Sequence, residues 1–298
     1  MLKNIYNHLG FRITYSFWET RKMRKRISKN GLQALSKLDV SQYKTSDTLY
    51  ILGSGISIMD LTQEEWASIS SHDSIGFNSW MHHPFVPTYY CMETPMKSEH
   101  FDLNIAALNR KKEEYSQVPF IIQYQHYLKS PNTIERLELP KENYYWNAPL
   151  MPYTTNERLL NRVLNWWKNK HELNMSWVLH YAGSISYLIS MGYLMGYKKI
   201  VLLGIDLNNS DYFFHHPQAS QEAKEYAKIH DELLGQSEES STSKAHQTTD
   251  KKFTSTYGCL PIDDYIYKFQ KILNDLDIEL EIGNTSSKLY PKLPLHTF

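Results

Sequence analysis

The strongest hydrophobic pattern in the chain lies between residues 182 and 206. Residues 183–196 are apolar with small residues interspersed, which predicts a buried helix that ends at Gly196. The next apolar run, 200–203, is aliphatic throughout, as expected for a central parallel strand that is covered on both faces. Asp206 follows the end of this strand. Since ligands bind at the carboxyl ends of strands in open α/β sheets, Asp206 is a candidate site residue.

The rest of the chain alternates between short apolar runs and longer helical patterns. Further strands are predicted at 49–52, 74–78, 86–92, 118–124 and 278–282. Apolar residues recur at helical spacing and predict helices at 61–69, 98–115, 157–168, 219–234 and 261–276. Residues 129–153 are rich in Pro, Asn and Tyr and predict an irregular connection. The alternation predicts an α/β fold, a Rossmann-like and mostly parallel sheet with helices on both faces.

Polar residues follow three of the predicted strands. Gly53-Ser54-Gly55 comes after the first strand, and the backbone N–H groups of such a turn can approach a phosphate or a ribose. The same sequence is also compatible with a plain tight turn between a strand and a helix that binds no ligand. Asn78 ends the second strand and Glu93 follows the third. We expect these side chains at one edge of the sheet, although Asn78 could equally cap a turn.

The N-terminal segment differs in charge from the rest of the chain. Its first thirty residues contain eight Lys and Arg but one acid, Glu19, and aromatic residues are interleaved with the bases. Such a segment can lie in the headgroup region of an anionic inner leaflet. It can also be a helix that packs on the main domain and leaves a basic face in solvent. We therefore divide the chain into a basic extension, 1–46, and an α/β domain, 47–298.

The amino-acid composition argues against several classes of protein. The 32 Lys and Arg balance the 32 Asp and Glu, so the basic excess of a nucleic-acid-binding domain is absent. Cys91 and Cys259 are the two cysteines, which indicates a reducing compartment and not a disulfide scaffold. No apolar run reaches the length of a transmembrane helix. We expect a cytoplasmic protein that is soluble or peripheral to the inner membrane.

A polar region follows Asp206. Residues 235–252 are rich in serine, threonine and charge, which predicts a mobile segment or a lid over the ligand, with a lid region of about 207–258. His246 lies within this region, as a candidate general base or as a solvated loop residue. His215 and His216 are adjacent and would form a poor metal chelate.

Four segments resemble the lipooligosaccharide-type sialyltransferases of bacteria and related transferases that use CMP-activated nonulosonic acids. They are Gly53-Ser54-Gly55-Ile56-Ser57, Gly76-Phe77-Asn78, residues 184–206 and Asn284-Thr285-Ser286. The central segment is the most specific of the four. The resemblance implies a GT-A-like variant of the fold and a bacterial enzyme of surface-glycan synthesis, such as lipopolysaccharide or capsule.

The chain departs from that family at several positions. Glu93 stands where the third strand of the family ends in asparagine. Asn208 replaces one of the two tyrosines of the family, and Tyr212 corresponds to the other. The position of His246 in the polar loop suits the catalytic histidine of the family. The number of residues between that histidine and the C-terminal Asn-Ser turn, counted back from Asn284, would instead place Tyr257 there.

The resemblance implies transfer of an acidic sugar, such as sialic acid or Kdo, from a CMP donor to a glycan or glycolipid acceptor, with inversion. His246 would be the base and Tyr212 the ligand of the leaving phosphate. The implied donor-binding residues are Gly53, Ser54, Gly55, Ser57, Asn78, Glu93, Ser184, Asp206 and Asn208. Ser184 could instead only pack at a helix start. No predicted strand ends in the Asp-x-Asp pair that holds a metal-bound sugar nucleotide, so we expect no metal and no cofactor.

Two other functions stay open from the sequence. A different nucleotide-dependent enzyme, such as a pyrophosphokinase, could use a similar sheet, although the G-x-x-x-x-G-K-[ST] loop is absent. A non-catalytic partner in glycan assembly could keep the fold without the chemistry. Aromatic-rich loops would also permit a homo-oligomer.

Overall fold

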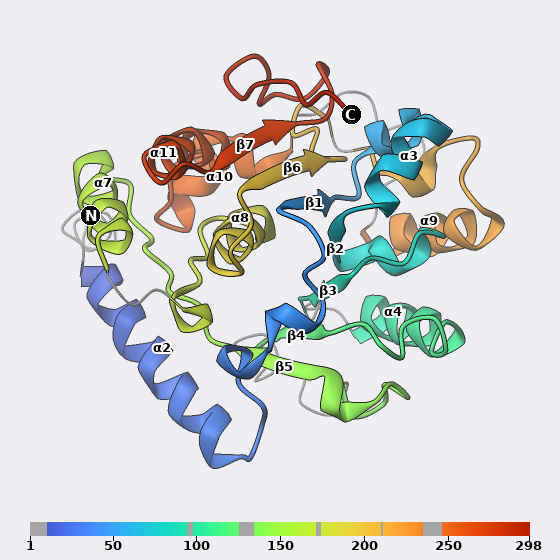
Figure 1. Ribbon diagram of the computed structural model, residues 1–298, viewed down its shortest axis with the longest axis horizontal. Helices are drawn as coiled ribbons and strands as arrows, with labels where there is room; N and C mark the ends of the chain where they lie inside the picture. Colours follow the sequence, from blue (N-terminus) through green and yellow to red (C-terminus); the bar gives the residue numbers. More distant parts are fainter. Residues whose placement is uncertain (1–10, 94–97, 125–133, 171–173, 210, 235–245) are drawn as a thin grey trace.

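The computed structural model describes residues 11–93, 98–124, 134–170, 174–209, 211–234 and 246–298. Seven parallel strands form one sheet at the centre of the molecule (Figure 1). In chain order they are β1 (Thr48–Leu52), β2 (Asp73–Phe77), β3 (Tyr89–Met92), β4 (Phe120–Gln123), β5 (Tyr144–Asn147), β6 (Lys199–Leu203) and β7 (Glu279–Ile282). The predicted α/β class is confirmed, with every strand pair parallel.

The order of the strands across the sheet is β5-β4-β3-β2-β1-β6-β7. The chain therefore moves outward in one direction from β1 to β5, returns to the centre, and continues on the other side with β6 and β7. β1 and β6 are neighbours, and Leu52 at the end of β1 is in register with Leu203 at the end of β6. The direction of winding reverses between these two strands. In open α/β sheets a ligand crevice forms at this kind of reversal, outside the carboxyl ends of the strands.

Helices cover both faces of the sheet (Figure 1). One apolar cluster joins alternate residues of β1, such as Leu49 and Ile51, to α7 (Glu157–Lys168), α8 (Ser184–Leu194) and α11 (Ile262–Asn274). A second cluster joins Tyr50 and Leu52 to α3 (Gln63–Ser70), α4 (Ser98–Arg110) and α9 (Gln221–Leu234). Successive side chains of a strand point to opposite faces, so β1 contributes to both cores.

Most predicted elements are present, and α7 has the predicted bounds. The interpretation of 129–153 as irregular was wrong, because β5 lies within it and all of its residues are buried. Its sequence, Tyr-Tyr-Trp-Asn, suits a strand, but it has no polar and apolar alternation to mark it. Of the predicted mobile segment, residues 235–245 lie outside the described residues. The segment after them is helical, with a 3₁₀ turn at Gln247–Thr249 and α10 at Lys251–Thr256.

The basic N-terminal extension contains helix α2 (Phe11–Lys29), which packs beside β5 (Figure 1). Ile13, Thr20 and Ile27 are buried on one face of this helix. The Thr20 hydroxyl donates to the Pro149 carbonyl at 2.8 Å, and the Ser16 hydroxyl accepts from the Met151 N–H at 3.2 Å. The packed-helix interpretation is therefore confirmed. No helix in the described part of the chain has the length and apolarity needed to span a bilayer.

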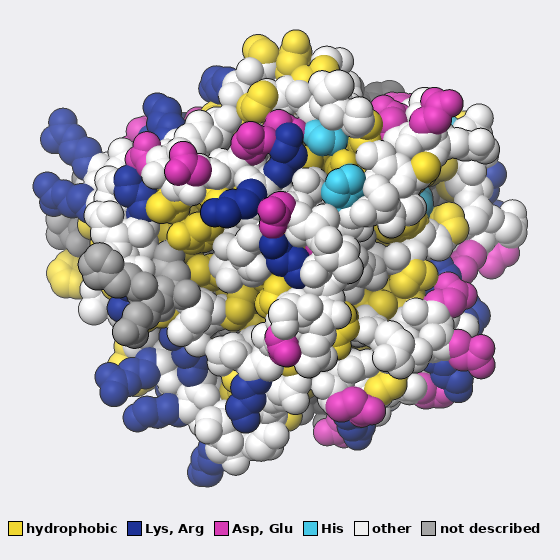
Figure 2. Space-filling view, in the orientation of Figure 1, with side chains coloured by type: hydrophobic (Ala, Val, Ile, Leu, Met, Phe, Trp, Pro, Cys, Tyr) yellow, Lys and Arg dark blue, Asp and Glu magenta, His cyan; other side chains and the backbone are white. Residues whose placement is uncertain are grey.

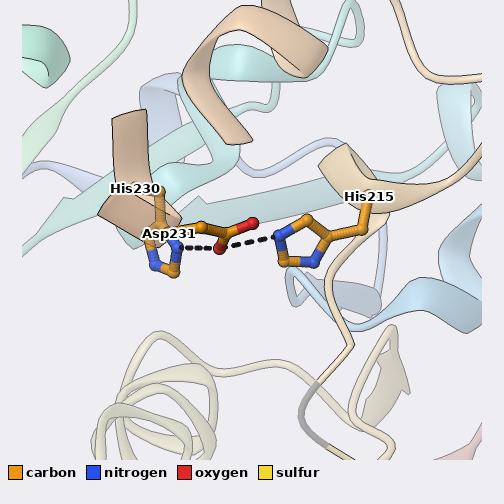
Figure 3. Close-up of side chains that lie close together, drawn as sticks. All are labelled: His215, His230 and Asp231. Atoms are coloured by element: carbon orange, nitrogen blue, oxygen red, sulfur yellow. Dashed lines mark hydrogen bonds and ion pairs between the residues drawn. The ribbon is translucent and has the colours of Figure 1, made fainter. Parts of the chain in front are cut away.

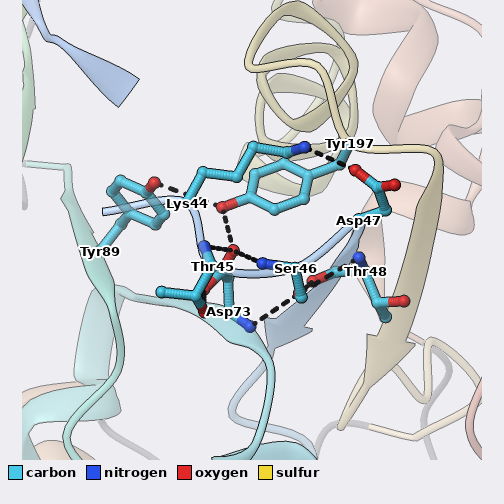
Figure 4. A network of polar contacts seen from close by, with 8 residues as sticks. All are labelled: Lys44, Thr45, Ser46, Asp47, Thr48, Asp73, Tyr89 and Tyr197. Carbon is cyan, nitrogen blue, oxygen red and sulfur yellow. Dashed lines mark hydrogen bonds and ion pairs between the residues drawn. The ribbon is translucent and has the colours of Figure 1, made fainter. Parts of the chain in front are cut away.

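At the amino ends of the strands, the buried carboxylate of Asp73 holds the start of β1 (Figure 4). Thr45 donates to it through its N–H at 2.9 Å and through its hydroxyl at 2.6 Å. The Ser46 N–H donates at 3.1 Å and the Tyr197 hydroxyl at 3.0 Å. Tyr197 follows α8, so one carboxylate ties the segment before β1, strand β2 and the end of α8 together. Hydrogen bonds to a charged acceptor are stronger than those between neutral groups.

We expect Asp73→Asn to lower the free energy of unfolding by about 3 kcal/mol, because the amide accepts at one atom only and turns its NH₂ group toward buried donors. Chemical denaturation monitored by circular dichroism measures this change. Asp47→Asn is the matched control, since Asp47 pairs with Lys44 in the same segment but its side chain is 73% exposed. Equal stability of the two variants would contradict the role given to Asp73.

Candidate functional site

A cavity of about 340 Å³ opens at the carboxyl ends of the strands, at the reversal between β1 and β6. Its walls come from the segments after β1, β2, β3 and β6, from the start of α8, and from α9 and the turn that follows residue 245. The polar and charged residues among its described lining are Ser54, Asn78, Ser79, Glu93, Ser184, Asp206, Asn209, Asp211, Tyr212, His230, His246 and Thr248.

The glycine turn after β1 is packed against the end of β6. The Gly53 N–H donates to the Leu203 carbonyl at 2.8 Å, and the Gly55 N–H donates to the Gly204 carbonyl at 2.8 Å. A Cβ atom on Gly55 would lie 2.6 Å from the Gly204 carbonyl oxygen and 2.6 Å from Asp206 Oδ2. These two N–H groups are therefore bonded within the protein and are not available to a phosphate, while the predicted approach of the turn to a phosphate or ribose stays a prediction. The glycines are needed because the two backbones approach closely.

Asp206 lies in the cavity wall and connects three segments. Its carboxylate accepts from the Ser57 hydroxyl and, at 3.2 Å, from the Ser57 N–H. The Asn284 side chain then donates to the Ser57 hydroxyl at 2.9 Å. Burial raises the pKa of Asp206, and the hydrogen bonds from Ser57 and Asn284 act in the opposite direction. Asp206 thus lines the cavity and also bonds neighbouring backbone, the two alternatives that the sequence left open.

A second polar group forms the part of the cavity near β2, β3 and α8. Ser184 is the first residue of α8, and its hydroxyl donates to Glu93 Oε1 at 2.7 Å. The Asn78 amide lies 3.4 Å from the same hydroxyl, and Gln123 donates to Glu93 Oε1 at 3.1 Å. His180 Nε2 is 3.8 Å from that oxygen. These contacts fix Glu93 Oε1 and leave Oε2 without a bond among the described residues.

Backbone strain is concentrated beside this cavity. Four non-glycine residues in the described part of the chain have a positive φ. Asn78 (53°) and Leu207 (60°) line the cavity, and Ala182 (57°) precedes the cavity residue Gly183. Such conformations cost free energy and persist at functional sites, where the surrounding structure imposes them. This observation supports a functional role for the cavity independently of any resemblance.

Tyr212 reaches the cavity because the loop after β6 returns to the glycine turn. Tyr212 forms an antiparallel bridge with Gly55, and the Phe213 N–H donates to the Ser54 carbonyl at 2.9 Å. The Tyr212 ring stacks on Phe214, with centroids 5.0 Å apart. Burial raises the pKa of Tyr212, so its hydroxyl keeps its proton at neutral pH and acts as a hydrogen-bond donor.

His246 lies on the cavity wall, directly after the segment that the structure leaves undescribed. Its N–H donates to the Leu207 carbonyl at 3.1 Å, and its Nδ1 lies 2.7 Å from the Thr248 hydroxyl. Burial lowers the pKa of His246. Tyr257, the alternative from counting, is 54% exposed and does not line the cavity.

Eight of the eleven residues proposed from the sequence line the cavity: Ser54, Gly55, Asn78, Glu93, Ser184, Asp206, Tyr212 and His246. Gly53 and Ser57 support the wall from behind through the bonds described above. Asn208 is exposed and donates to the Ser286 carbonyl instead of lining the cavity.

Sequence reasoning missed the cavity residues His230, Phe214 and Thr248. His230 lies in the middle of an amphipathic helical pattern and carries no local signal. Thr248 stands two residues from His246, and that spacing alone could have marked it as a partner of the imidazole.

The charge of the cavity is negative. Glu93, Asp206 and Asp211 contribute carboxylates, and the described lining contains no lysine or arginine. A bound phosphate would therefore be held by hydroxyl, amide and imidazole donors and not by a fixed positive charge.

One group among the described residues has the composition of a metal site. His215 Nε2 and His230 Nδ1 lie 3.1 Å and 3.2 Å from the same oxygen, Asp231 Oδ1 (Figure 3). His216, the neighbour in sequence, is not part of the group. His215 Nδ1 also accepts from the Tyr212 N–H at 3.4 Å, so the proton of a neutral ring is on Nε2 and is donated to Asp231. Hydrogen bonds account for these contacts without a metal.

No family model and no curated protein matches the sequence. Among solved structures, the monofunctional alpha-2,3-sialyltransferase Cst-I from Campylobacter jejuni is similar at 14% identity and a TM-score of 0.44, over 86% of this chain and 84% of that one. The sialyltransferase CST-II, in complex with a trisaccharide acceptor and CMP, is similar at 14% identity and a TM-score of 0.41, over 84% of this chain and 86% of that one. Similarity at this level does not transfer an activity or a site residue to this chain.

We expect Gly55→Ala to lower the free energy of unfolding by about 1–3 kcal/mol, because its Cβ must displace the Asp206 carboxylate or the Gly204 backbone. The φ of Gly55, −63°, suits any residue, so the effect is one of space. Gly183→Ala is the control, since a Cβ there meets no atom within 4 Å. Thermal unfolding of both variants measures the difference, and a Gly55→Ala variant as stable as Gly183→Ala would show that the turn can move aside.

Proposed function

We propose that this protein is a glycosyltransferase that transfers an acidic sugar from a CMP donor to a bacterial surface glycan. The observation that carries the proposal is the convergence of Asn78, Ser184, Tyr212 and His246 on one cavity at the reversal of the sheet. The fold alone is compatible with many nucleotide-dependent reactions. The resemblance of residues 53–57, 76–78, 184–206 and 284–286 to the sialyltransferase family supports CMP as the nucleotide.

His246 is the proposed general base. Its Nδ1 accepts from the Thr248 N–H at 3.4 Å, so a neutral ring carries its proton on Nε2 in this structure, and the Thr248 hydroxyl lies 2.7 Å from Nδ1. For catalysis we propose the other tautomer, in which the Thr248 hydroxyl accepts the Nδ1 proton and Nε2 carries the lone pair that removes the proton of the acceptor hydroxyl. Its lowered pKa keeps the imidazole unprotonated at neutral pH.

Tyr212 is the proposed donor to the leaving phosphate. As CMP departs, negative charge develops on the phosphate oxygen, and the protonated Tyr212 hydroxyl stabilises it by a hydrogen bond. We propose that no metal and no cofactor takes part, since hydroxyl and amide donors are available in the cavity.

Glu93 is proposed to bind the sugar of the donor. Its Oε2 can accept from a ring hydroxyl or an amide N–H of the sugar, and its charge stabilises an oxocarbenium-like transition state. The carboxylate of an acidic sugar must lie elsewhere in the cavity. The Glu93 carboxylate and a sugar carboxylate 4 Å apart would repel each other by about 4 kcal/mol at an effective dielectric constant near 20.

CMP should raise the thermal stability of the purified protein more than UMP, GDP, ADP or NAD do. A ligand that binds only the folded state stabilises it by about 2.7 kcal/mol at about 100 times its Kd, which is several degrees of Tm for a chain of this size. Differential scanning fluorimetry measures the shift. Ser184→Ala should reduce it, whereas the exposed variant Ser71→Ala should not.

Other outcomes of this measurement discriminate between the functions. Preference for UMP or GDP would reject the CMP donor, and preference for ADP would favour a pyrophosphokinase-like enzyme. No shift with any nucleotide would favour a non-catalytic partner in glycan assembly.

The acid limb of the pH profile of kcat/KM should have its midpoint below 6.5, because burial lowers the pKa of His246 and the base must be unprotonated to act. His246→Gln should lower kcat by about 10²–10⁴ with little change in CMP binding. Tyr257→Phe is the control for the alternative assignment. An acid limb with its midpoint above pH 6.5 would exclude His246 as the base. Activity that is lost in Tyr257→Phe and kept in His246→Gln would exclude it as well.

A further inference from the structure

Helix α2 presents two different faces. Its inner face packs on the domain through Ile13, Thr20 and Ile27, as described above. Phe11, Tyr15 and Trp18 follow one another at intervals of four and three residues, so they share the opposite face. They are 58%, 54% and 55% exposed, which is unusual for large aromatic side chains.

The C-terminal half of this exposed face is basic. Lys22 and Lys29 continue the line of Trp18, with Lys25 and Arg26 beside them, and all four side chains are exposed. Lys22 Nζ lies 4.8 Å from the centroid of the Trp18 ring. The helix carries seven bases and one acid, Glu19. Figure 2 shows lysine and arginine side chains gathered at the lower left, where α2 lies in Figure 1.

We propose that this aromatic-basic face of α2, formed by Phe11, Tyr15, Trp18, Lys22 and Lys29, binds the headgroup region of an anionic lipid bilayer. Tryptophan and tyrosine favour the boundary between hydrocarbon and water, where the ring is buried and its polar atom stays hydrated. Lysines beside them are attracted to acidic headgroups. The helix lies parallel to the surface, because its other face is held by the domain.

The charge pattern of this face favours a lipid surface over two other binding partners, a second copy of the chain and a nucleic acid. A second copy of the chain in a two-fold contact would bring together two helices that each carry seven bases and one acid, and this net like charge would oppose the contact. A nucleic acid would pair with the bases but would leave the aromatic half of the face without an apolar environment. This proposal does not depend on the glycosyltransferase activity, so either can fail while the other holds.

Co-sedimentation of the full chain with phosphatidylcholine vesicles, with and without phosphatidylserine, tests the proposal. We expect binding to the phosphatidylserine vesicles that weakens as salt is added, and little binding to phosphatidylcholine alone. The double variant Lys22→Gln/Lys29→Gln should weaken binding about tenfold or more, as should Phe11→Ser/Trp18→Ser.

The matched control is Lys251→Gln/Lys252→Gln, which removes two exposed charges from α10. It should bind vesicles as the unmodified chain does, and unchanged Tm values should show that all variants are folded. Absence of binding, equal binding to both kinds of vesicle, or an equal loss in the control would overturn the proposal. A Phe11→Ser/Trp18→Ser variant that turns a dimer into a monomer in analytical ultracentrifugation would assign the face to a second copy instead.

Discussion

The close contact between the backbone after β1 and the backbone after β6 is the constraint on which the site depends. Gly53 and Gly55 donate to the Leu203 and Gly204 carbonyls, so the two strand ends stay joined beyond the sheet itself. At a reversal of winding, neighbouring segments normally diverge and leave a crevice. Here the hydrogen bonds of Gly53 and Gly55 keep the two backbones together at the bottom of the crevice, and the polar side chains line the cavity above them.

The same contact determines where the catalytic candidates lie. Because the loop after β6 pairs with the glycine turn, Tyr212 is brought over the end of β1. Leu207, whose positive φ turns the chain, then accepts the N–H of His246. Two residues far apart in sequence thus depend on one local geometry, and a substitution that forces the glycines apart should displace both of them.

The two ends of the sheet are stabilised differently. At the amino ends, Asp73 is buried and saturated with donors, and the network contributes stability but no open polar group. At the carboxyl ends, Asn78, Ala182 and Leu207 have a positive φ, and Glu93 Oε2 has no hydrogen bond among the described residues. Folding tolerates only a few kcal/mol of backbone strain. The hydrogen bonds to Asp73 at the amino ends of the strands therefore offset the free-energy cost of the strained residues at the carboxyl ends.

The sequence predicted elements whose pattern is local. Helix α7 and strands β1 and β6 carry their own periodicity and end signals, and the strand-end residues Asn78, Glu93 and Asp206 follow from the parallel topology. Strand β5 was missed because its buried aromatics do not alternate with polar residues. His230 was missed because only the packing of α9 against the loop after β6 brings it to the cavity. The engaged N–H groups of Gly53 and Gly55 also depend on a tertiary contact that no glycine pattern encodes.

A net charge of zero conceals a separation of charge within the molecule. The exposed face of α2 is basic, whereas the described lining of the cavity carries three carboxylates and no lysine or arginine. The proposed anionic donor would therefore gain no long-range attraction from the cavity, and its affinity would come from short-range hydrogen bonds to Asn78, Ser184 and Tyr212. A site of this kind selects by geometry and not by charge. Seven of the 32 Lys and Arg lie on α2, outside the cavity, where under the proposal above they would act on an extended anionic surface without competing for the substrate.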